Sequence, residues 1–319
     1  MGADICNLVD ANNKMNYKKP IAITIGDPAG VGAEIIRSWA FENIACCSSC
    51  VAIGHRSFLE TLPEEIGKFQ VGAYDYYAKL GSPDEEGAQI AFDALEESAI
   101  GCVQGRYSAV LTAPISKACM KKVGFDFQGQ TEFFADRWSG VPVMSFAGEK
   151  LIVSLATWHD ALKDVPYLIS EANITRAVEA SACLARLLKD VQEPRIAVCG
   201  LNPHAGENGI MGREEIEIIN PILDKLRGRF ANLSESLPPD TVFARVLKGE
   251  FDCIVSMYHD QALAPLKTIE FDNAVNVSMN LKYFRASPDH GTAFSIAGKS
   301  IASNKSFSAA FELLRKAVL

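Results

Sequence analysis

Short apolar runs alternate along the chain with longer stretches of helical periodicity, and this alternation constrains the fold more than any other feature. PIAITIG (Pro20–Gly26), CVAIG, SAVLTAP, LIVSLAT, RIAVCG, DCIVSMY and AVNVSMN have the length and composition of buried strands. Apolar residues at helical spacing separate them, as over residues 87–103, 174–189, 213–226 and 306–319. Strands joined by helical crossovers pair mostly in parallel, with both sheet faces covered. The sequence therefore predicts an α/β protein.

Chain length, net charge and the lack of long apolar stretches limit the kinds of protein that this chain can be. The 319 residues suit two domains or one large lobed unit. A net charge of −8, from 31 basic and 39 acidic residues, argues against nucleic-acid binding, which needs an excess of Lys and Arg. No apolar stretch approaches the roughly 18 residues of a membrane-spanning helix. Residues 1–17 lack the apolar run of a signal peptide, and we expect them to form a polar, disordered extension.

The nine cysteines are an odd number in a chain without a visible secretion signal, which favours free thiols in a reducing cytoplasm. Cys46, Cys47 and Cys50 form one local cluster. They could supply three ligands of a structural zinc site, with His55 as the nearby candidate for a fourth. The lack of a further ligand at suitable spacing favours ordinary thiols instead.

Three of the five histidines lie just past predicted strands. His159 stands in SLATWHDAL, His204 in AVCGLNPHAGENG and His259 in CIVSMYHDQ. Open α/β sheets place ligands at the carboxyl ends of parallel strands, so these imidazoles could converge on one ion, as in catalytic zinc sites. Alternatively, each histidine caps a loop or bonds to the backbone. Asp160 and Asp260 follow two of the candidate ligands and could fix their tautomers, or cap loops themselves.

A second set of polar residues suits an anion. Lys267, Asn276 and Arg285 lie beside apolar residues and offer a point charge, an amide and a planar fork, which together suit a phosphate plus a carboxylate. GQTEFF places Gln130 and Thr131 at a helix start, where backbone N–H groups can hold an anion. The alternatives are solvated surface residues and, for Thr131, a plain helix N-cap.

Two glycine-bearing segments follow strands. GDPAGVG (Gly26–Gly32) resembles a phosphate loop but lacks the glycine spacing and the Lys-Ser/Thr pair, and a tight turn accounts for it. SPDHGTAFSIAG (Ser287–Gly298) contains a turn of small residues that lets the backbone approach a flat ligand, and His290 could stack on a base. The second segment is therefore the candidate nucleotide contact.

These motifs together resemble the 4-hydroxythreonine-4-phosphate dehydrogenase family. The matching strings run in order from about Pro20 to the C-terminus: ITIGDPAGVGAEI, AVLTAPISKA, GQTEFFA, CGLNPHAGENGIMGREEIEII, LPPDTVF, MYHDQALAPLK and the stretch from NVSMNLKYFR to DHGTA. The resemblance implies a fold like that of isocitrate and isopropylmalate dehydrogenases, with two α/β lobes, an interlobe cleft and mostly parallel sheets. It implies a homodimer, with one lobe formed by 18–130 and 284–319 and the other, by 131–283, carrying metal ligands and dimer contacts.

The resemblance also implies the site. A divalent ion, zinc in preference to magnesium or cobalt, would be shared across the dimer interface, and the cofactor would be NAD or NADP. The family's metal ligands fall on His159, His204 and His259; its substrate contacts on Thr131, Lys267, Asn276 and Arg285; its adenosine-binding turn on His290, Gly291, Thr292 and Ala293.

The implied reaction is oxidation of 4-phosphooxy-L-threonine to 2-amino-3-oxo-4-phosphooxybutanoate, which decarboxylates to 3-amino-2-oxopropyl phosphate in pyridoxal 5′-phosphate biosynthesis. Lys267, for anion binding or proton transfer, and Asp260 are the candidate catalytic residues. Asp240 is a further polar candidate, or a helix N-cap. The chain departs from the family at Gln130, where the family usually has His before its Thr; Gln donates a hydrogen bond but carries no charge.

Three alternatives remain at this point. The same chemistry could act on a four-carbon sugar-acid phosphate or on a cyclic diol dicarboxylate, because Gln130 leaves the substrate open. Acyl or phosphoryl transfer is possible because phosphate acetyltransferases share the two-lobed architecture, although that chemistry needs no histidine triad. A non-catalytic ligand-binding relative is the remaining alternative.

Overall fold

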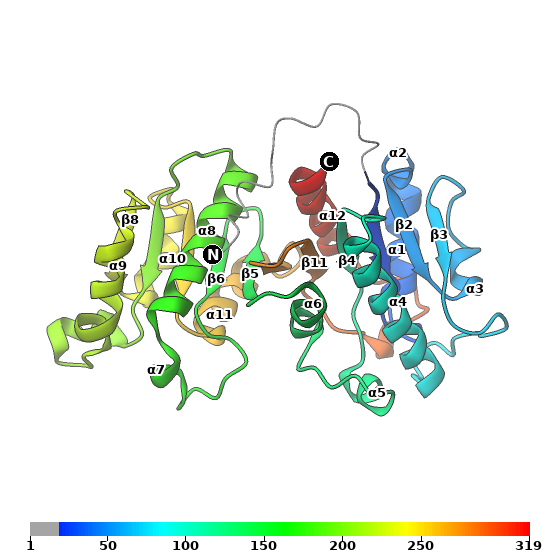
Figure 1. The fold of residues 1–319 in the computed structure, drawn as a ribbon, viewed down its shortest axis with the longest axis horizontal. Coiled ribbons are helices and arrows are strands. Elements are labelled where there is room, and N and C mark those ends of the chain that lie inside the picture. The colour runs from blue at the N-terminus through cyan, green and yellow to red at the C-terminus, as the bar shows by residue number, and fades with distance from the viewer. Residues whose placement is uncertain (1–18) are drawn as a thin grey trace. The chain divides into compact units, whose positions relative to one another are not determined.

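The computed structural model describes residues 19–319, which divide into two compact units (Figure 1). The terminal unit contains residues 19–142 and 275–319, and the central unit contains residues 143–274. Each unit has its own strands and its own apolar core. The extension predicted for residues 1–17 lies outside the described residues.

The terminal unit is built on six strands in the order β3-β2-β1-β4-β11-β10. Neighbouring strands run parallel except β10 and β11, which are antiparallel. The elements of this unit are β1 (Ile21–Thr24), α1 (Gly32–Glu42), α2 (Ile44–Cys47), β2 (Cys50–Gly54), α3 (Arg56–Leu59), β3 (Gly67–Gln70), α4 (Glu85–Val103), β4 (Ala109–Thr112), α5 (Lys117–Lys122), α6 (Gln130–Trp138), β10 (Val275–Met279), β11 (Phe284–Pro288), η4 (Phe294–Ile296) and α12 (Lys305–Val318).

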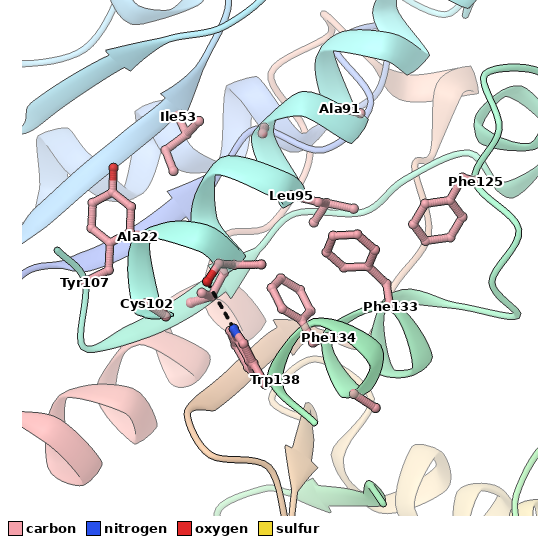
Figure 2. Packing of buried hydrophobic residues seen from close by; sticks show 14 of the residues in the cluster. Ala22, Ile53, Ala91, Leu95, Cys102, Tyr107, Phe125, Phe133, Phe134 and Trp138 are labelled. Carbon is pink, nitrogen blue, oxygen red and sulfur yellow. Dashed lines mark hydrogen bonds between the residues drawn. The ribbon is translucent and has the colours of Figure 1, made fainter. Parts of the chain in front are cut away.

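Helices α4 and α6 bury one apolar cluster against β1, β2 and β4 of this sheet. Figure 2 shows the aromatic part of the cluster, in which Phe133 and Phe134 pack beside Trp138. Burying each phenyl ring contributes about 2 kcal/mol. The indole N–H of Trp138 donates to the carbonyl of Ala99 at 3.2 Å, so its polar atom is satisfied inside the core. Helix α4 begins where the Asp84 carboxylate accepts from the backbone N–H of Gly87.

The central unit has five strands in the order β5-β6-β9-β7-β8. Only the β5–β6 pair is antiparallel. Its elements are β5 (Val143–Ala147), β6 (Ile152–Leu155), α7 (Val165–Leu168), α8 (Glu171–Lys189), β7 (Ile196–Cys199), η2 (Pro203–Gly209), η3 (Glu215–Ile219), α9 (Asn220–Leu226), β8 (Leu233–Leu237), α10 (Pro239–Leu247), β9 (Cys253–Ser256) and α11 (His259–Glu270).

Helices also cover the strands of the central unit. Val242 and Phe243 of α10 and Leu266 of α11 join an apolar cluster with residues of β6, β7 and β9. Helix α8 packs on β6 and β9 and is capped by Ser170, whose hydroxyl accepts from the N–H of Asn173. The strand ends of β6, β7 and β9 thereby carry the segments that contain the three candidate histidines.

The α/β class and the mostly parallel pairing predicted from the sequence are confirmed. Strands β3, β5, β8 and β11 are additional to the prediction. The helix expected over 213–226 is divided into a π-helical turn, η3, and α9. The unit bounds differ from those expected, because α6 packs in the terminal core and β10 pairs with β11, which places 131–142 and 275–283 in the terminal unit. Within residues 19–319, no helix has the length and apolar content needed to cross a bilayer.

Candidate functional site

One face of the terminal sheet gathers polar side chains around Arg285. In β11, Arg285 is paired with Val110 of β4 and with Ser278 of β10. Side chains of paired residues, and of residues two positions apart, point to the same face of a sheet. Thr112 and Asn276, two positions from Val110 and Ser278, therefore share the face of Arg285. Helix α6 begins beside these residues, because its first residue, Gln130, contacts Arg285.

The guanidinium of Arg285 is held by neutral oxygens. Nε and Nη2 both donate to the hydroxyl of Thr112, at 3.1 and 2.7 Å. Nη1 donates to Oδ1 of Asn276 at 3.0 Å and to the hydroxyl of Ser278 at 3.4 Å. Nη2 also donates to Oε1 of Gln130 at 3.0 Å. Residues from β4, β10 and α6 thus fix the plane of the guanidinium.

This arginine is a buried cation without a paired anion. Arg285 is 4% exposed, and no ion pair forms on it within the described residues. Burial lowers the pKa of Arg285 to about 9, and the nearby charge of Glu132 opposes that shift through space. A desolvated guanidinium favours an anionic partner, and its planar fork matches phosphate or carboxylate. The arrangement is therefore chemically suited to bind an anion.

The start of α6 is held to this face by two side chains. Gln130 donates from Nε2 to the carbonyl of Ala113 at 3.1 Å while its Oε1 accepts from Arg285. Thr131 is buried, and its hydroxyl lies 3.0 Å from that of Ser278. The N-cap of α6 is Gly129, and no side chain caps it. The alternative that Thr131 is the N-cap is therefore wrong.

Two other candidates lie in the central unit. Lys267 is half-buried in α11. Asp240 lies in the first turn of α10, whose N-cap is Pro238, and no side chain caps that helix. The N-cap alternative for Asp240 is therefore wrong as well.

Two of the three candidate metal ligands lie together. The ring centres of His159, after β6, and His259, at the start of α11, are 6.0 Å apart. Two imidazoles bound to one zinc at about 2.0–2.1 Å have ring centres on the order of 5–6 Å apart, so this pair is spaced for a shared ion. Nδ1 of His259 lies 2.7 Å from Oδ1 of Asp260, which leaves Nε2 available as a ligand atom.

His204 is presented separately, on a backbone turn of unusual conformation. His204, Ala205, Gly206, Glu207 and Asn208 all have positive φ, between 42° and 81°. Side-chain-bearing residues rarely adopt this region, and each costs of order 1 kcal/mol there. Within residues 19–319, no three His, Cys, Asp or Glu side chains are grouped to hold one metal ion, so a single chain does not bring the three histidines together.

A buried carboxylate supports this turn. Glu215 is 1% exposed, and its Oε1 accepts from the backbone N–H groups of Leu201 and Asn202 at 2.8 and 2.7 Å. Its Oε2 accepts from the side-chain amide of Asn202 at 3.0 Å. A Cβ at Gly206 would lie 2.6 Å from Oε2, so the turn closes around the carboxylate only with glycine there. Glu215 is thus the central acceptor beneath the residues that carry His204.

The candidate cofactor turn follows β11. The carbonyl of Thr292 accepts from the N–H of Val31 at 3.0 Å, which ties the turn to the start of α1. Nε2 of His290 is buried without a hydrogen-bond partner among the described residues, and the space beside Gly291 is open. Ala293 has φ 47°. An unsatisfied buried nitrogen beside an open glycine suits a nucleotide contact.

A pocket adjoins this turn. It has a volume of about 370 Å³, and its lining includes Gly30, Glu34, His55, Leu80 and Gly298. A Cβ at Gly30 would lie 2.8 Å from the carbonyl oxygen of Thr292, so pocket and turn are contiguous. Burial lowers the pKa of His55 to about 4, which keeps this lining residue neutral.

The cysteine cluster behaves as ordinary thiols. Cys46, Cys47 and Cys50 are free, and the Cys47 thiol donates to the carbonyl of Ala40 at 3.4 Å. Burial raises the pKa of Cys50 to about 12. The described residues contain no three-ligand group here, so the zinc interpretation finds no support.

Sequence reasoning missed three residues of this arrangement. Ser278 lies two positions after Asn276 in AVNVSMN, so strand alternation placed it on the same face. Thr112 is the last residue of its strand, at the edge where ligands bind. For Glu215 no signal was available, because a carboxylate in a helical stretch ordinarily faces solvent.

The chain resembles known proteins along most of its length. A sequence model of the family described as "Pyridoxal phosphate biosynthetic protein PdxA" matches residues 23–314. The 4-hydroxythreonine-4-phosphate dehydrogenase of Saccharophagus degradans is 38% identical over 306 residues, 89% of this chain and 91% of that protein. The protein of the same name from Zymomonas mobilis is 39% identical over 88% of this chain and 90% of its own length. The crystal structure of 4-hydroxythreonine-4-phosphate dehydrogenase from Klebsiella pneumoniae has a TM-score of 0.81 and 29% identity, covering 94% of this chain and 100% of that one.

Proposed function

This chain belongs to the family of the pyridoxal phosphate biosynthetic protein PdxA, and on that premise we propose that it is an oxidoreductase acting on 4-hydroxythreonine 4-phosphate in pyridoxal phosphate biosynthesis. The main structural support is that the guanidinium of Arg285 is buried and surrounded by neutral acceptors. Such a group suits the phosphate of this substrate. Thr131 and Asn276 complete the substrate contacts in the terminal unit, and Gln130 stands beside them at the start of α6.

The metal ligands would be divided between two copies of the chain. His159 and His259 have the ring spacing that a shared divalent ion requires, and imidazole nitrogen favours zinc. His204 of the partner subunit would complete the set in a homodimer. Two features support this division. His204 is exposed on its turn, and Ile210 and Met211, further along the same segment, are 79% and 46% exposed.

The cofactor would be NAD or NADP at the turn formed by His290, Gly291, Thr292 and Ala293. The unpartnered Nε2 of His290 and the open space at Gly291 support this assignment. The neighbouring pocket offers room for part of a dinucleotide.

The residues then have distinct roles. A divalent ion at the three histidines would supply a Lewis acid for the substrate hydroxyl, and a nicotinamide at the turn of His290 would supply the hydride acceptor. Asp260, whose Oδ1 lies 2.7 Å from Nδ1 of His259, would orient that ring so that Nε2 serves as the ligand atom. Arg285 orients the phosphate, and Lys267 binds a substrate anion or transfers a proton. The product, 2-amino-3-oxo-4-phosphooxybutanoate, is a β-keto acid and loses carbon dioxide to give 3-amino-2-oxopropyl phosphate.

The compartment would be the cytoplasm. The described cysteines are free thiols, among them the closely spaced Cys46, Cys47 and Cys50, and thiols persist in a reducing compartment.

The test is nicotinamide reduction by the metal-loaded protein, followed by absorbance. We expect turnover of 4-hydroxythreonine 4-phosphate, and Arg285→Met should raise its KM at least about tenfold, because a charged hydrogen bond is lost. Unphosphorylated 4-hydroxythreonine is the control substrate, and its KM should not change in that variant.

Other outcomes would redirect the proposal. Faster turnover of a four-carbon sugar-acid phosphate or a cyclic diol dicarboxylate would replace the substrate and keep the chemistry. Acyl transfer from an acyl phosphate, without nicotinamide reduction on any substrate, would replace the reaction class.

A further inference from the structure

Every N–H donor of Arg285 is already occupied. Arginine has five side-chain N–H groups. One on Nε and one on Nη2 donate to Thr112, two on Nη1 donate to Asn276 and Ser278, and the second on Nη2 donates to Gln130. An anion can therefore bind this guanidinium directly only by replacing one of these acceptors.

Two of the acceptors are fixed by the sheet. Thr112 and Ser278 are 0% and 1% exposed, and both have short side chains on strands. Ser278 is also held by the hydroxyl of Thr131 at 3.0 Å. Thr112 takes both donors on the Nε edge of Arg285, so it sets the rotation of the guanidinium about its long axis.

Gln130 is the acceptor that can leave. It is half-buried, has a longer side chain than Asn276, and stands at the first residue of α6. The N-cap residue of this helix, Gly129, supplies no side-chain cap, and helix N-termini favour anions, so the segment that carries Gln130 itself favours an incoming anion. Asn276 lies on a strand and so lacks this advantage.

We propose that Oε1 of Gln130 stands in for an oxygen of the anionic substrate at Nη2 of Arg285 and is displaced when that anion binds, while Thr112 keeps the guanidinium oriented. Gln130 is then a specificity-determining residue and Thr112 a positioning residue. The inference rests on the proposed role of Arg285 as the anion-binding group. A neutral amide satisfies the buried N–H without cancelling the charge that attracts the anion.

The proposal predicts that removing the Gln130 side chain raises the affinity for phosphate, whereas removing a direct ligand would lower it. If Gln130 competes with the anion, Gln130→Ala should bind inorganic phosphate more tightly, by about tenfold, because one hydrogen bond to a charged group no longer has to be broken. If Gln130 were itself a phosphate ligand, the same change would weaken binding. Calorimetry with inorganic phosphate measures this without cofactor or metal. Gln128→Ala, at an exposed glutamine two residues earlier, is the matched control and should bind as the wild type does.

Thr112 is tested by one substitution that removes its hydroxyl and one that keeps it. Thr112→Val should weaken phosphate binding about tenfold, since the buried edge of the guanidinium loses its acceptor and the group reorients. Thr112→Ser keeps the hydroxyl and should restore binding, which a purely steric role would not do. Thermal unfolding of each variant, with and without phosphate, reports binding to the folded protein independently of loss of stability.

These measurements distinguish the roles of Gln130 and Thr112 from the anion-binding role of Arg285. Unchanged or weaker phosphate binding in Gln130→Ala overturns the stand-in role, and unchanged binding in Thr112→Val overturns the positioning role. Arg285→Met should abolish phosphate binding; if it does not, the anion site of the proposed function fails instead.

Discussion

Oδ1 of Asp260 lies 2.7 Å from Nδ1 of His259, the residue beside it at the start of α11. Neighbours along a chain usually point apart, yet here the carboxylate turns back to the imidazole it follows. A carboxylate this close to one ring nitrogen restrains the orientation of the imidazole, whose centre lies 6.0 Å from that of His159.

Asp260→Ala should therefore weaken metal binding by about 10–100-fold, the range expected when the hydrogen-bond partner of a ligating imidazole is removed. Competition with a zinc chelator measures the affinity. Asp160→Ala is the matched control, because Asp160 follows His159 in the same way and is exposed. Equal losses in both variants would show that general charge, and not the contact to His259, is responsible.

His204→Ala should abolish metal binding and turnover while the dimer stays folded, because His204 supplies one ligand. If that ligand comes from the partner subunit, mixing His204→Ala with His159→Ala protein should recover about a quarter of wild-type activity after subunit exchange, since random pairing rebuilds one intact site in half of the dimers. Gel filtration checks the dimer. No recovery in a mixture shown to have exchanged subunits would place all three ligands in one chain.

Glu215→Gln should lower the free energy of unfolding by about 1–3 kcal/mol and weaken metal binding, because the two N–H groups under the turn lose a charged acceptor. Chemical denaturation and chelator competition give the two quantities. Glu214→Gln is the control, as Glu214 accepts from Asn202 and Arg213 but is only half-buried. Metal affinity that survives in Glu215→Gln would mean that His204 does not depend on this carboxylate.

His55 should make the protein sensitive to acid. Its pKa is lowered by burial from 6.5 to about 4, so between these pH values the unfolded chain binds a proton that the folded protein does not. The stability this provides is fully present above pH 6.5 and declines, by up to about 3 kcal/mol, as the pH falls through this window. His55→Asn keeps an acceptor for the N–H of Phe58 and should flatten that part of the profile. The measurement is the free energy of unfolding in urea at pH 4.5, 5.5 and 7.5 for the wild type and for His55→Asn. If the two proteins lose stability in parallel, a group other than His55 causes the acid sensitivity.

The sequence predicts the elements that have a periodic apolar pattern. It does not predict elements or bonds that depend on contacts between distant segments. Buried strands such as β1 and β4 are visible because both faces are apolar. Strand β3 (Gly67–Gln70) is exposed at every position and is held by pairing with β2, which no local pattern records. Gln130 was correctly placed at a helix start, whereas its bond to Arg285, 155 residues away, depends on strand register.

The histidines illustrate the same limit. The positions after strand ends predicted that His159, His204 and His259 converge, and of these the rings of His159 and His259 lie 6.0 Å apart. His204 follows a strand of the same sheet, but its left-handed turn redirects it, and residue types such as Ala205 and Glu207 give no sign of that conformation. The buried Glu215 that supports the turn is equally invisible, since its pattern is that of a surface helix.

Strand alignment and charge are linked at Arg285. Sliding β11 by a single residue against β4 would exchange the sides taken by Arg285 and Ala286, and would send a full positive charge into an apolar layer with none of its four acceptors. Such an isomer of the fold is strongly disfavoured. The guanidinium proposed to bind the anion therefore also favours the correct register of β11 in the sheet.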